Sequence, residues 1–400
     1  MTVTERLLHY VSFDTQSDES SETCPSTAKQ KLLGEALVEE MRALGIADAR
    51  IDADGYVYGS VPGTPGAPAI GLIAHMDTSP DCSGKDIKPR IVEYNGGDIA
   101  LNENTVLSPE DFPILSRSIG KHLIVTDGTT LLGADDKAGV AEIMAAVETM
   151  IEKNVKHGEV RVIFTTDEEI GNGVDGLDVQ ELGCDYGYTV DGGPLGEIEF
   201  ENFNAASAVL TVHGVGVHPG SAKNVMINAA TAAMAFHAML PEDEVPEKTD
   251  GYEGFFHLTE MSGSVTEATL RYIIRDHDRE RFEEKKALFA DCAARLNEIY
   301  GDGTAEAQIN DSYYNMKEKV LPHFHLIERA ENAFRANGVE PQCVPIRGGT
   351  DGARLSWDGL PCPNLSTGGY NYHGVREWIP ADSLEAMTNV LVTLTESFAE

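Results

Sequence analysis

The stretch Ala69-Ile70-Gly71-Leu72-Ile73-Ala74-His75-Met76-Asp77 decides the fold of this 400-residue chain. It begins as an apolar run bounded by turn residues, which predicts a buried β-strand. His75 and Asp77 stand at positions i and i+2, so on a strand both side chains point to the same face. Open α/β sheets bind ligands at the carboxyl ends of their strands, which predicts a site here. Taken alone, the pair is equally consistent with a packed histidine beside a solvated aspartate.

Two further predicted strands also end in carboxylates. Val160 to Thr165 runs into Asp167-Glu168-Glu169, and Tyr186 to Val190 ends in Asp191. Apolar residues at helical spacing predict a helix from about Lys137 to Lys153, between the first of the three strands and the second. This alternation of strand and helix predicts an α/β domain built on a mixed, largely parallel sheet.

The character of the sequence changes at about residue 206. Between residues 206 and 312 the predicted order is strand, helix, strand, strand, helix, strand, which is the split βαβ pattern of an α/β sandwich. A chain of this length exceeds one typical core. We therefore predict a first domain of residues 1–205 plus 313–400, with residues 206–312 inserted into it.

The composition excludes several classes of partner. The formal net charge is −36, which argues against nucleic acid and anionic membranes because both are polyanions. No apolar run reaches the length of about 18 residues that a transmembrane helix needs. The first residues lack the basic and apolar regions of a secretory signal, which predicts a cytoplasmic protein. The six cysteines form no Cys-x-x-Cys pair and are expected to be reduced.

Side chains that can bind metal ions gather at the ends of the first-domain strands and in the adjoining loops: His75, Asp77, Asp135, Asp136, Glu168, Glu169, Asp191 and His373. Six of these eight are carboxylates, which in one crevice would repel and raise one another's proton affinity. A cation relieves that repulsion, and imidazole with carboxylate suits zinc, or manganese and cobalt. The set is large enough for two ions, as in two-metal hydrolases.

The order of the motifs resembles the zinc-dependent M20 family of metallopeptidases, and within it the tripeptide aminopeptidases. The resemblance covers essentially the whole chain and is carried by nine segments: His75–Asp81, Leu132–Gly139, Asp167–Glu169, Val190–Gly193, Asn202–Ala206, Val217–Gly220, Tyr272–Asp276, Arg347–Gly352 and Gly368–Gly374. It implies a dizinc catalytic domain and an inserted lid and dimerisation domain. His-x-Asp alone is a weak signal, but nine segments in this order are specific.

The resemblance also implies the metal ligands. His75, Asp135 and Asp191 would hold one zinc ion, and Asp135, Glu169 and His373 would hold the other, so that Asp135 bridges two Zn²⁺ per subunit. Co²⁺ and Mn²⁺ are possible substitutes. In this family the peptide bond between the residues matching Asp135 and Asp136 is often cis.

Five further residues receive roles from the same resemblance. Asp77 would orient His75, and Glu168 would be the general base. His218 would reach the active site of the partner subunit in a homodimer and stabilise the oxyanion. Arg275 and Arg347 are candidates for binding the substrate's terminal carboxylate. The structural alternatives are a turn role for His218, a salt bridge from Arg275 to Asp276, and a helix-capping role for Arg347.

The implied function is release of the N-terminal residue from tripeptides by a hydroxide bound to two zinc ions. Asp rather than Glu at position 191 favours aminopeptidases within the family. One alternative is another M20 activity: dipeptidase, carboxypeptidase or N-acyl amino acid hydrolase. Another is a catalytically silent peptide-binding homologue, which would lack the base or a ligand, and none is missing from the sequence.

Overall fold

The computed structural model describes residues 1–399, and the chain separates into two compact units. The first unit consists of Met1–Phe200, Glu318–Val344 and the stretch from Thr350 onward, and the second of Glu201–Lys317 and Pro345–Gly349. The predicted insertion, residues 206–312, lies within the second unit, which begins earlier and ends later. The short segment Pro345–Gly349 joins the second unit because the Ile346 amide donates to the Glu201 carbonyl (2.8 Å).

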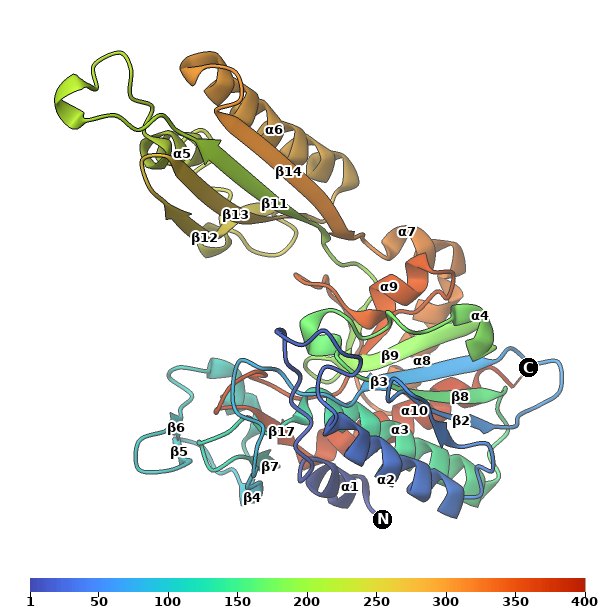
Figure 1. Ribbon diagram of the computed structural model, residues 1–400. Coiled ribbons are helices and arrows are strands. Elements are labelled where there is room, and N and C mark those ends of the chain that lie inside the picture. The colour runs from blue at the N-terminus through green and yellow to red at the C-terminus, as the bar shows by residue number, and fades with distance from the viewer. Residues whose placement is uncertain (400) are drawn as a thin grey trace. The chain divides into compact units, whose positions relative to one another are not determined.

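The first unit is built on a sheet of eight strands in the order β1-β2-β8-β3-β9-β16-β10-β15. Figure 1 labels β2, β8, β3 and β9 of this sheet. In chain order the strands are β1 (Arg50–Ile51), β2 (Val57–Val61), β3 (Ile70–His75), β8 (Val160–Thr165), β9 (Tyr186–Gly192), β10 (Glu197–Glu199), β15 (Gln342–Cys343) and β16 (Asn364–Ser366). Strand β3 pairs in parallel with β8 and β9, and β9 with β16, whereas the pairs β1–β2, β2–β8 and β10–β16 are antiparallel. The predicted mixed, largely parallel sheet is confirmed.

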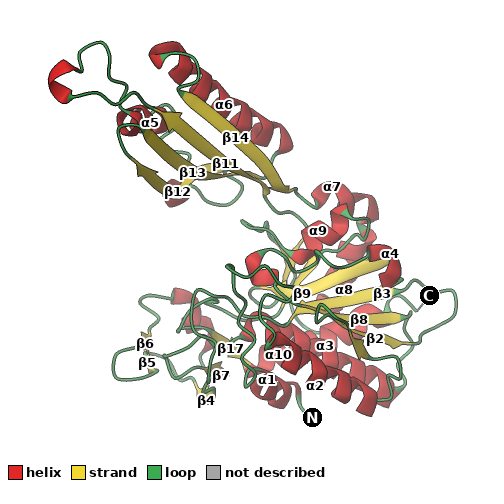
Figure 2. Cartoon of the chain, in the orientation of Figure 1, coloured by secondary structure: helices red, strands yellow, loops and turns green. Residues whose placement is uncertain are grey.

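Helices cover this sheet on both sides, as Figure 2 shows. They are α1 (Val3–Tyr10), α2 (Gln30–Ala43), α3 (Ala134–Lys153), α4 (Val179–Leu182), α7 (Lys317–Val320, at the boundary between the units), α8 (His325–Ala336), α9 (Asp351–Trp357) and α10 (Ala381–Glu396). Helix α3 packs along β3 and β9, and α1 and α10 pack against α3. In a separate apolar cluster, Ile73 of β3 and Ile163 of β8 meet Leu182 of α4 and Leu355 of α9.

Strand β3 is central because its sequence is apolar on both faces. All of its residues are buried, including Ile70, Leu72 and Ile73 at 0% exposure, which is typical of an inner parallel strand. Helix α3 is apolar nearly all round, so it can lie buried beside the strand. Its first turn departs from helical geometry at Asp135 and Asp136, which are joined by a cis peptide bond.

The predicted polar insertion after β3 carries small strands of its own. Strands β4 (Arg90–Glu93), β7 (His122–Val125) and β17 (Trp378–Pro380) form one sheet, and β5 (Ile99–Ala100) pairs with β6 (Val106–Leu107). Trp378 is buried with Leu123 and Val125 in the core of this subregion. Strand β17 thereby connects the segment that follows His373 to this subregion.

The second unit contains a four-stranded antiparallel sheet in the order β12-β13-β11-β14. In chain order its elements are β11 (Asn204–His213), α5 (Ala229–His237), β12 (Phe255–Gly263), β13 (Glu267–Asp276), α6 (Arg279–Tyr300) and β14 (Ala305–Tyr313). This is the predicted order of strands and helices. The core forms between the sheet and the helices, where the rings of Phe236 on α5 and Phe289 on α6 lie 4.8 Å apart.

Among residues 1–399, no helix combines the length and apolar character needed to cross a lipid bilayer.

Candidate metal centre

The sheet topology of the first unit brings the predicted metal ligands to one edge. His75 is the last residue of β3, and Asp191 lies near the end of the neighbouring strand β9. On the other side of β3, strand β8 ends at Thr165 and leads into a 3₁₀ turn, Glu168–Ile170. Because β8, β3 and β9 run parallel, their carboxyl ends meet at the same edge, as the sequence predicts.

The Asp135 carboxylate lies between two imidazole rings. Its Oδ1 atom is 2.9 Å from Nε2 of His75, and its Oδ2 atom is 3.2 Å from Nε2 of His373. Nε2 of His75 is also 3.4 Å from Oδ1 of Asp191, and Nε2 of His373 is 2.9 Å from Oε2 of Glu169. The five predicted ligands therefore form one connected cluster, with Asp135 in the middle.

The donor atoms of this cluster fit a divalent cation. One ligand atom each from His75, Glu168 and Asp191 lies within 4.8 Å of the others, and the same holds for His75, Asp135 and Glu169. Oε1 of Glu169 is buried and has no hydrogen-bond partner among the described residues. A buried carboxylate oxygen without a donor is costly unless a cation pairs with it. Imidazole nitrogen with carboxylate oxygen is a donor set that suits zinc.

The crowding of carboxyl groups is visible in their proton affinities. Burial and the nearby Asp135 raise the pKa of Glu169 to about 7. Burial raises the pKa of Asp191 to about 6, against the opposing effect of His75. Hydrogen bonds to Asp135 and Glu169 raise the pKa of His373 to about 11. Without a metal ion the cluster retains protons at neutral pH, and metal binding would displace them.

Burial, with the charge of Asp191 nearby, also raises the pKa of Glu168 well above its usual range. Asp135 behaves in the opposite way. Burial opposes its ionisation, but hydrogen bonds from His373 and His75 hold its pKa below the ordinary value. The centre therefore contains one firmly ionised carboxylate, shared by two histidines, among carboxyl groups that hold their protons more tightly.

Asp77 fixes the loop that carries the two glutamates. Its side chain is fully buried, and its two oxygens accept hydrogen bonds from the backbone amides of Glu168 (3.1 Å) and Glu169 (3.2 Å). Oδ1 of Asp77 also lies 3.2 Å from Nδ1 of His75. One carboxylate thus contacts both the His75 ring and the 3₁₀ turn.

Asp136 is the other aspartate at the start of α3, and its side chain binds backbone amides. Its carboxylate accepts hydrogen bonds from the amides of His75 (3.2 Å) and Gly139 (3.1 Å). Its contact with Gly139 corresponds to the helix-capping role that short polar residues take at a helix start. The cis bond between Asp135 and Asp136 is the one that the family resemblance implies.

Several buried carboxylates near the centre, Asp167, Asp351 and Glu377 among them, were not singled out from the sequence. Asp167 accepts hydrogen bonds from the Ser26 amide (2.6 Å), the Ser26 hydroxyl (2.5 Å) and Nε2 of Gln30 (2.6 Å), which anchors the residue before Glu168. Glu377 accepts hydrogen bonds from three backbone amides, those of Leu132, Gly133 and Asp135. Asp167 belongs to the motif Asp167–Glu169, which is visible in the sequence. Glu377 lies in no motif that would mark it as part of the site.

The second unit holds the other three predicted residues. His218 is exposed, and its Nδ1 accepts a hydrogen bond from the Gly220 amide (3.1 Å), which caps the 3₁₀ turn Pro219–Ser221. The turn role expected as an alternative is therefore present. Since Nδ1 is an acceptor, the neutral ring carries its proton on Nε2.

Arg347 holds the loop before β12 and does not cap a helix. Its guanidinium donates to the carbonyls of Gly251 (2.8 Å), Glu253 (3.1 Å) and Thr249 (3.3 Å). Nη1 of Arg275 donates to the Arg347 carbonyl (3.0 Å), and Nε of Arg275 is buried without a hydrogen-bond partner among the described residues. The two arginines therefore lie together, but only Arg275 has a buried donor that no protein acceptor uses.

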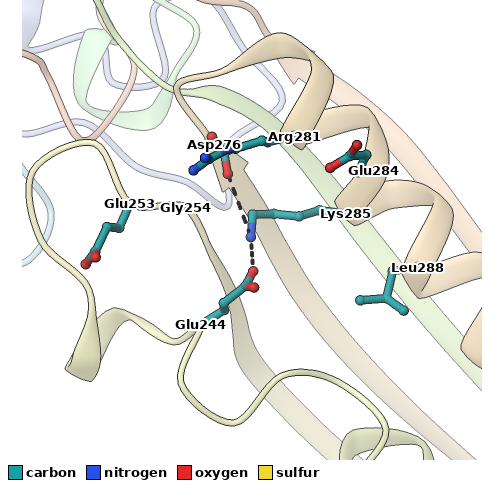
Figure 3. Close-up of a pocket in the computed structure, with 8 residues that line it drawn as sticks. All are labelled: Glu244, Glu253, Gly254, Asp276, Arg281, Glu284, Lys285 and Leu288. Carbon is teal, nitrogen blue, oxygen red and sulfur yellow. Dashed lines mark hydrogen bonds and ion pairs between the residues drawn. The ribbon is translucent and has the colours of Figure 1, made fainter.

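Asp276 pairs with Lys285 and not with Arg275, the partner expected as an alternative. Asp276 lies 3.7 Å from Nζ of Lys285, which also pairs with Glu244 (Figure 3). These residues line a hollow of about 420 Å³ in the second unit, and no predicted site residue lines it. Because none of the lining residues is a predicted site residue, the hollow does not extend the candidate site.

Comparisons with known proteins agree with this geometry. Residues 200–304 match the peptidase dimerisation domain of the M20 family. The chain is 52% identical to Peptidase T of Clostridium novyi (strain NT), over 100% of this chain and 99% of that protein. It is 53% identical to Peptidase T of Desulfitobacterium hafniense (strain Y51), over 100% of this chain and 98% of that protein.

Solved structures share the fold of this chain. Aminopeptidase PepT from Bacillus cereus ATCC 10987 superimposes with a TM-score of 0.80 at 25% identity, covering 100% of this chain and 98% of that one. The YXEP protein of Bacillus subtilis, described as a dinuclear metal-binding peptidase of the M20 family, shares the fold with a TM-score of 0.68. That likeness has 14% identity and covers 99% of this chain and 98% of that one.

Proposed function

Because this chain belongs to the peptidase T family of M20 peptidases, we propose that it is a zinc-dependent tripeptide aminopeptidase with two metal ions per subunit. The observation that carries the proposal is the Asp135 carboxylate, which offers one oxygen to each of two histidines. A single carboxylate placed in this way can bridge two cations. Two-metal hydrolases use such pairs of ions on one substrate carbonyl and one water.

The residues present divide into two ligand sets. His75, Asp135 and Asp191 would hold one ion, and Asp135, Glu169 and His373 the other. When bound, the ions polarise the scissile carbonyl and lower the pKa of a nearby water. The orphaned oxygen of Glu169 gains a partner in this arrangement. Co²⁺ and Mn²⁺ accept the same ligands and are expected to substitute.

Glu168 is the proposed general base. Its backbone amide is fixed by Asp77 (3.1 Å), and its carboxylate lies with His75 and Asp191 at the centre. Its raised pKa reflects burial beside other carboxyl groups, and nearby cations would lower that pKa. Ionised Glu168 would take a proton from the attacking water and return it to the leaving amine.

His218 is the proposed donor to the oxyanion, acting in the partner subunit of a homodimer. Its Nδ1 is occupied by the Gly220 amide, so Nε2–H is the available donor on an exposed ring. A hydrogen-bond donor aimed at the developing negative charge is worth more in the transition state than in the ground state. The match of residues 200–304 to a peptidase dimerisation domain supports the homodimer.

Arg275 is the stronger candidate for the substrate's terminal carboxylate. Its buried Nε has no protein partner, whereas the Nη atoms of Arg347 are engaged with backbone carbonyls. Arg347 supports Arg275 through its own carbonyl oxygen. A preference for tripeptides would require a fixed distance between this cation and the metal ions.

A small panel of peptides tests the function. We would measure hydrolysis of Ala-Ala, Ala-Ala-Ala, Ala-Ala-Ala-Ala and N-acetylated Ala-Ala-Ala, with and without a chelator. The proposal predicts zinc-dependent release of the N-terminal residue from the free tripeptide alone. Preferred cleavage of the dipeptide or the acetylated peptide would indicate another M20 hydrolase. Absence of turnover with both metals bound would indicate a peptide-binding homologue.

A further inference from the structure

The proposed ligand His373 lies in a loop whose ends are tied together. The backbones of Tyr370 and Trp378 exchange two hydrogen bonds (2.9 and 3.0 Å), and their rings stack with centroids 4.2 Å apart. Within the loop, Asn371 and His373 adopt left-handed backbone conformations, with φ of 58° and 61°. Such conformations are uncommon for residues other than glycine and need surrounding structure to hold them.

Glu377 lies in the same loop and reaches the segment that carries Asp135. Its side chain is 1% exposed. One oxygen accepts hydrogen bonds from the amides of Leu132 (2.6 Å) and Gly133 (2.8 Å), and the other accepts from the Asp135 amide (3.1 Å). Burial raises the pKa of Glu377 to about 7, and the three amide donors oppose this shift because they favour the ionised form. In that form the hydrogen bonds are charge-assisted and stronger than neutral pairs.

We propose that Glu377 is a positioning residue that couples the His373 loop to the Asp135 segment and thereby sets the metal affinity of the position these two ligands share. The proposal rests on the ligand sets of the proposed function. His373 and Asp135 are far apart in the sequence. Glu377 lies in the loop of His373 and accepts a hydrogen bond from the backbone amide of Asp135. Outer residues that orient metal ligands typically contribute about 10–100-fold in metal affinity.

The metal position formed by Asp135, Glu169 and His373 depends on this coupling more than the other metal position does. His75 and Asp191 stand on strands β3 and β9, whose pairing does not involve Glu377. His373 has no strand of its own to hold it, and its ring reaches Asp135 and Glu169 only if the loop keeps its place. Asp135 belongs to both ligand sets but His373 to only one, so loss of the Glu377 contacts should weaken the position that contains His373 more than the other.

The variant Glu377→Gln tests this with little change of shape. A glutamine has one acceptor oxygen and one NH₂ group, so at least one of the three amide donors would face a donor. Glu142→Gln is the matched control, because Glu142 of α3 is also fully buried but has no hydrogen-bond partner among the described residues. Burial raises the pKa of Glu142 well above its usual range, so glutamine resembles its protonated form.

The readout is zinc binding by the full chain, measured by elemental analysis and by competition with a chromophoric chelator. We expect two zinc ions in the unsubstituted protein and in Glu142→Gln. In Glu377→Gln, the position that contains His373 should weaken about 10–100-fold, and the other position, which shares only Asp135 with it, should weaken less. Two positions of unchanged affinity in Glu377→Gln would overturn the inference, as would equal weakening of both, which indicates general damage.

Circular dichroism checks that each variant is folded. If Glu377→Gln fails to fold, Glu377→Asp replaces it, since the shorter carboxylate cannot reach all three amides and should weaken the same position. Fewer than two zinc ions in the unsubstituted protein would instead contradict the proposed ligand sets, and the inference would fail with them. The two failures are thus distinguished by whether the unsubstituted protein binds two ions.

Discussion

Oδ1 of Asp77 accepts a hydrogen bond from the backbone amide of Glu168 at 3.1 Å. Through this contact the segment that carries the proposed ligand His75 also fixes the position of the proposed base. The second oxygen of Asp77 accepts from the next amide, that of Glu169 (3.2 Å). A single buried carboxylate on the defining stretch of the sequence therefore organises both sides of the candidate centre.

Replacing Asp77 by asparagine should impair both functions of that carboxylate. Asparagine can accept from one of the two amides, but its NH₂ group would face the other donor. We expect kcat on Ala-Ala-Ala to fall about 10–100-fold and zinc affinity to fall with it. The control is Asp302→Asn, because Asp302 is exposed and lies after helix α6. This variant should retain both kcat and zinc affinity. Unchanged kcat and zinc affinity in Asp77→Asn would show that these contacts are not needed.

Replacing Glu168 by glutamine removes the proposed proton carrier while preserving shape. We expect turnover of Ala-Ala-Ala to fall by about 10²–10⁴-fold, the usual contribution of general acid–base catalysis. Zinc content should remain at two ions per subunit, because Glu168 belongs to neither proposed ligand set. Turnover close to that of the unsubstituted protein, with zinc content preserved, would refute the assignment of the base.

The role of His218 in the partner subunit predicts complementation. His218→Ala and Glu168→Gln should each be nearly inactive as homodimers. In a mixed dimer, the site with an intact Glu168 receives an intact His218 from its partner, so random mixing after dissociation should restore about a quarter of full activity. A mixture no more active than its components would contradict the assignment, as would full activity in a strict monomer.

Arg275→Gln should weaken recognition of the substrate's terminal carboxylate. A hydrogen bond to a charged group is worth about 2 kcal/mol, so KM for Ala-Ala-Ala should rise roughly 30-fold. The control is Ala-Ala-Ala-amide, whose hydrolysis by the unsubstituted protein should already be poor and should change little in the variant. An equal loss on both substrates would indicate that Arg275 acts through the fold.

Metal binding should stabilise the protein more at pH 8 than at pH 5. Burial and Asp135 raise the pKa of Glu169 from 4.5 to about 7, and burial raises the pKa of Asp191 from 3.8 to about 6. The folded metal-free protein therefore binds more protons than the unfolded chain across this window, so its stability falls as pH rises from about 4 to 7. The pKa of His373, raised from 6.5 to about 11 by Asp135 and Glu169, acts in the same direction at higher pH.

A bound cation removes that loss of stability because it pairs with the ionised carboxylates. We would measure the rise in Tm caused by zinc at several pH values between 5 and 8, in the unsubstituted protein and in Asp135→Asn. In the unsubstituted protein, the rise in Tm caused by zinc should grow with pH. In Asp135→Asn, it should be much smaller at every pH. A rise that shrinks with increasing pH would contradict the cluster as the site of binding.

The sequence predicts the fold well where the signals are local. The apolar run that ends in His75 becomes the buried strand β3, and residues 206–312 show the order of elements that the second unit adopts. The ligand candidates could be collected because each ends or follows a strand, opens a helix or, like His373, lies in an adjoining loop. The comparisons confirm the family that these motifs resemble.

Contacts between distant segments could not be predicted in this way. Glu377 binds amides more than 240 positions earlier in the chain, and Asp167 binds Ser26 and Gln30. Neither contact leaves a periodic or compositional mark, because a backbone amide is offered by nearly every residue type. The engagement of Arg347 with carbonyl groups of a loop was likewise invisible, and it shifts the carboxylate-binding assignment toward Arg275.

The most direct test of the central claim is the zinc content per subunit, measured together with tripeptide cleavage as zinc is added back to metal-free protein. We predict that release of the N-terminal residue from Ala-Ala-Ala reaches its maximum at two zinc ions per subunit, and that Asp135→Asn neither binds the pair nor cleaves the peptide. Full activity at one zinc ion or none, or two ions bound with full activity in Asp135→Asn, would contradict a centre bridged by Asp135.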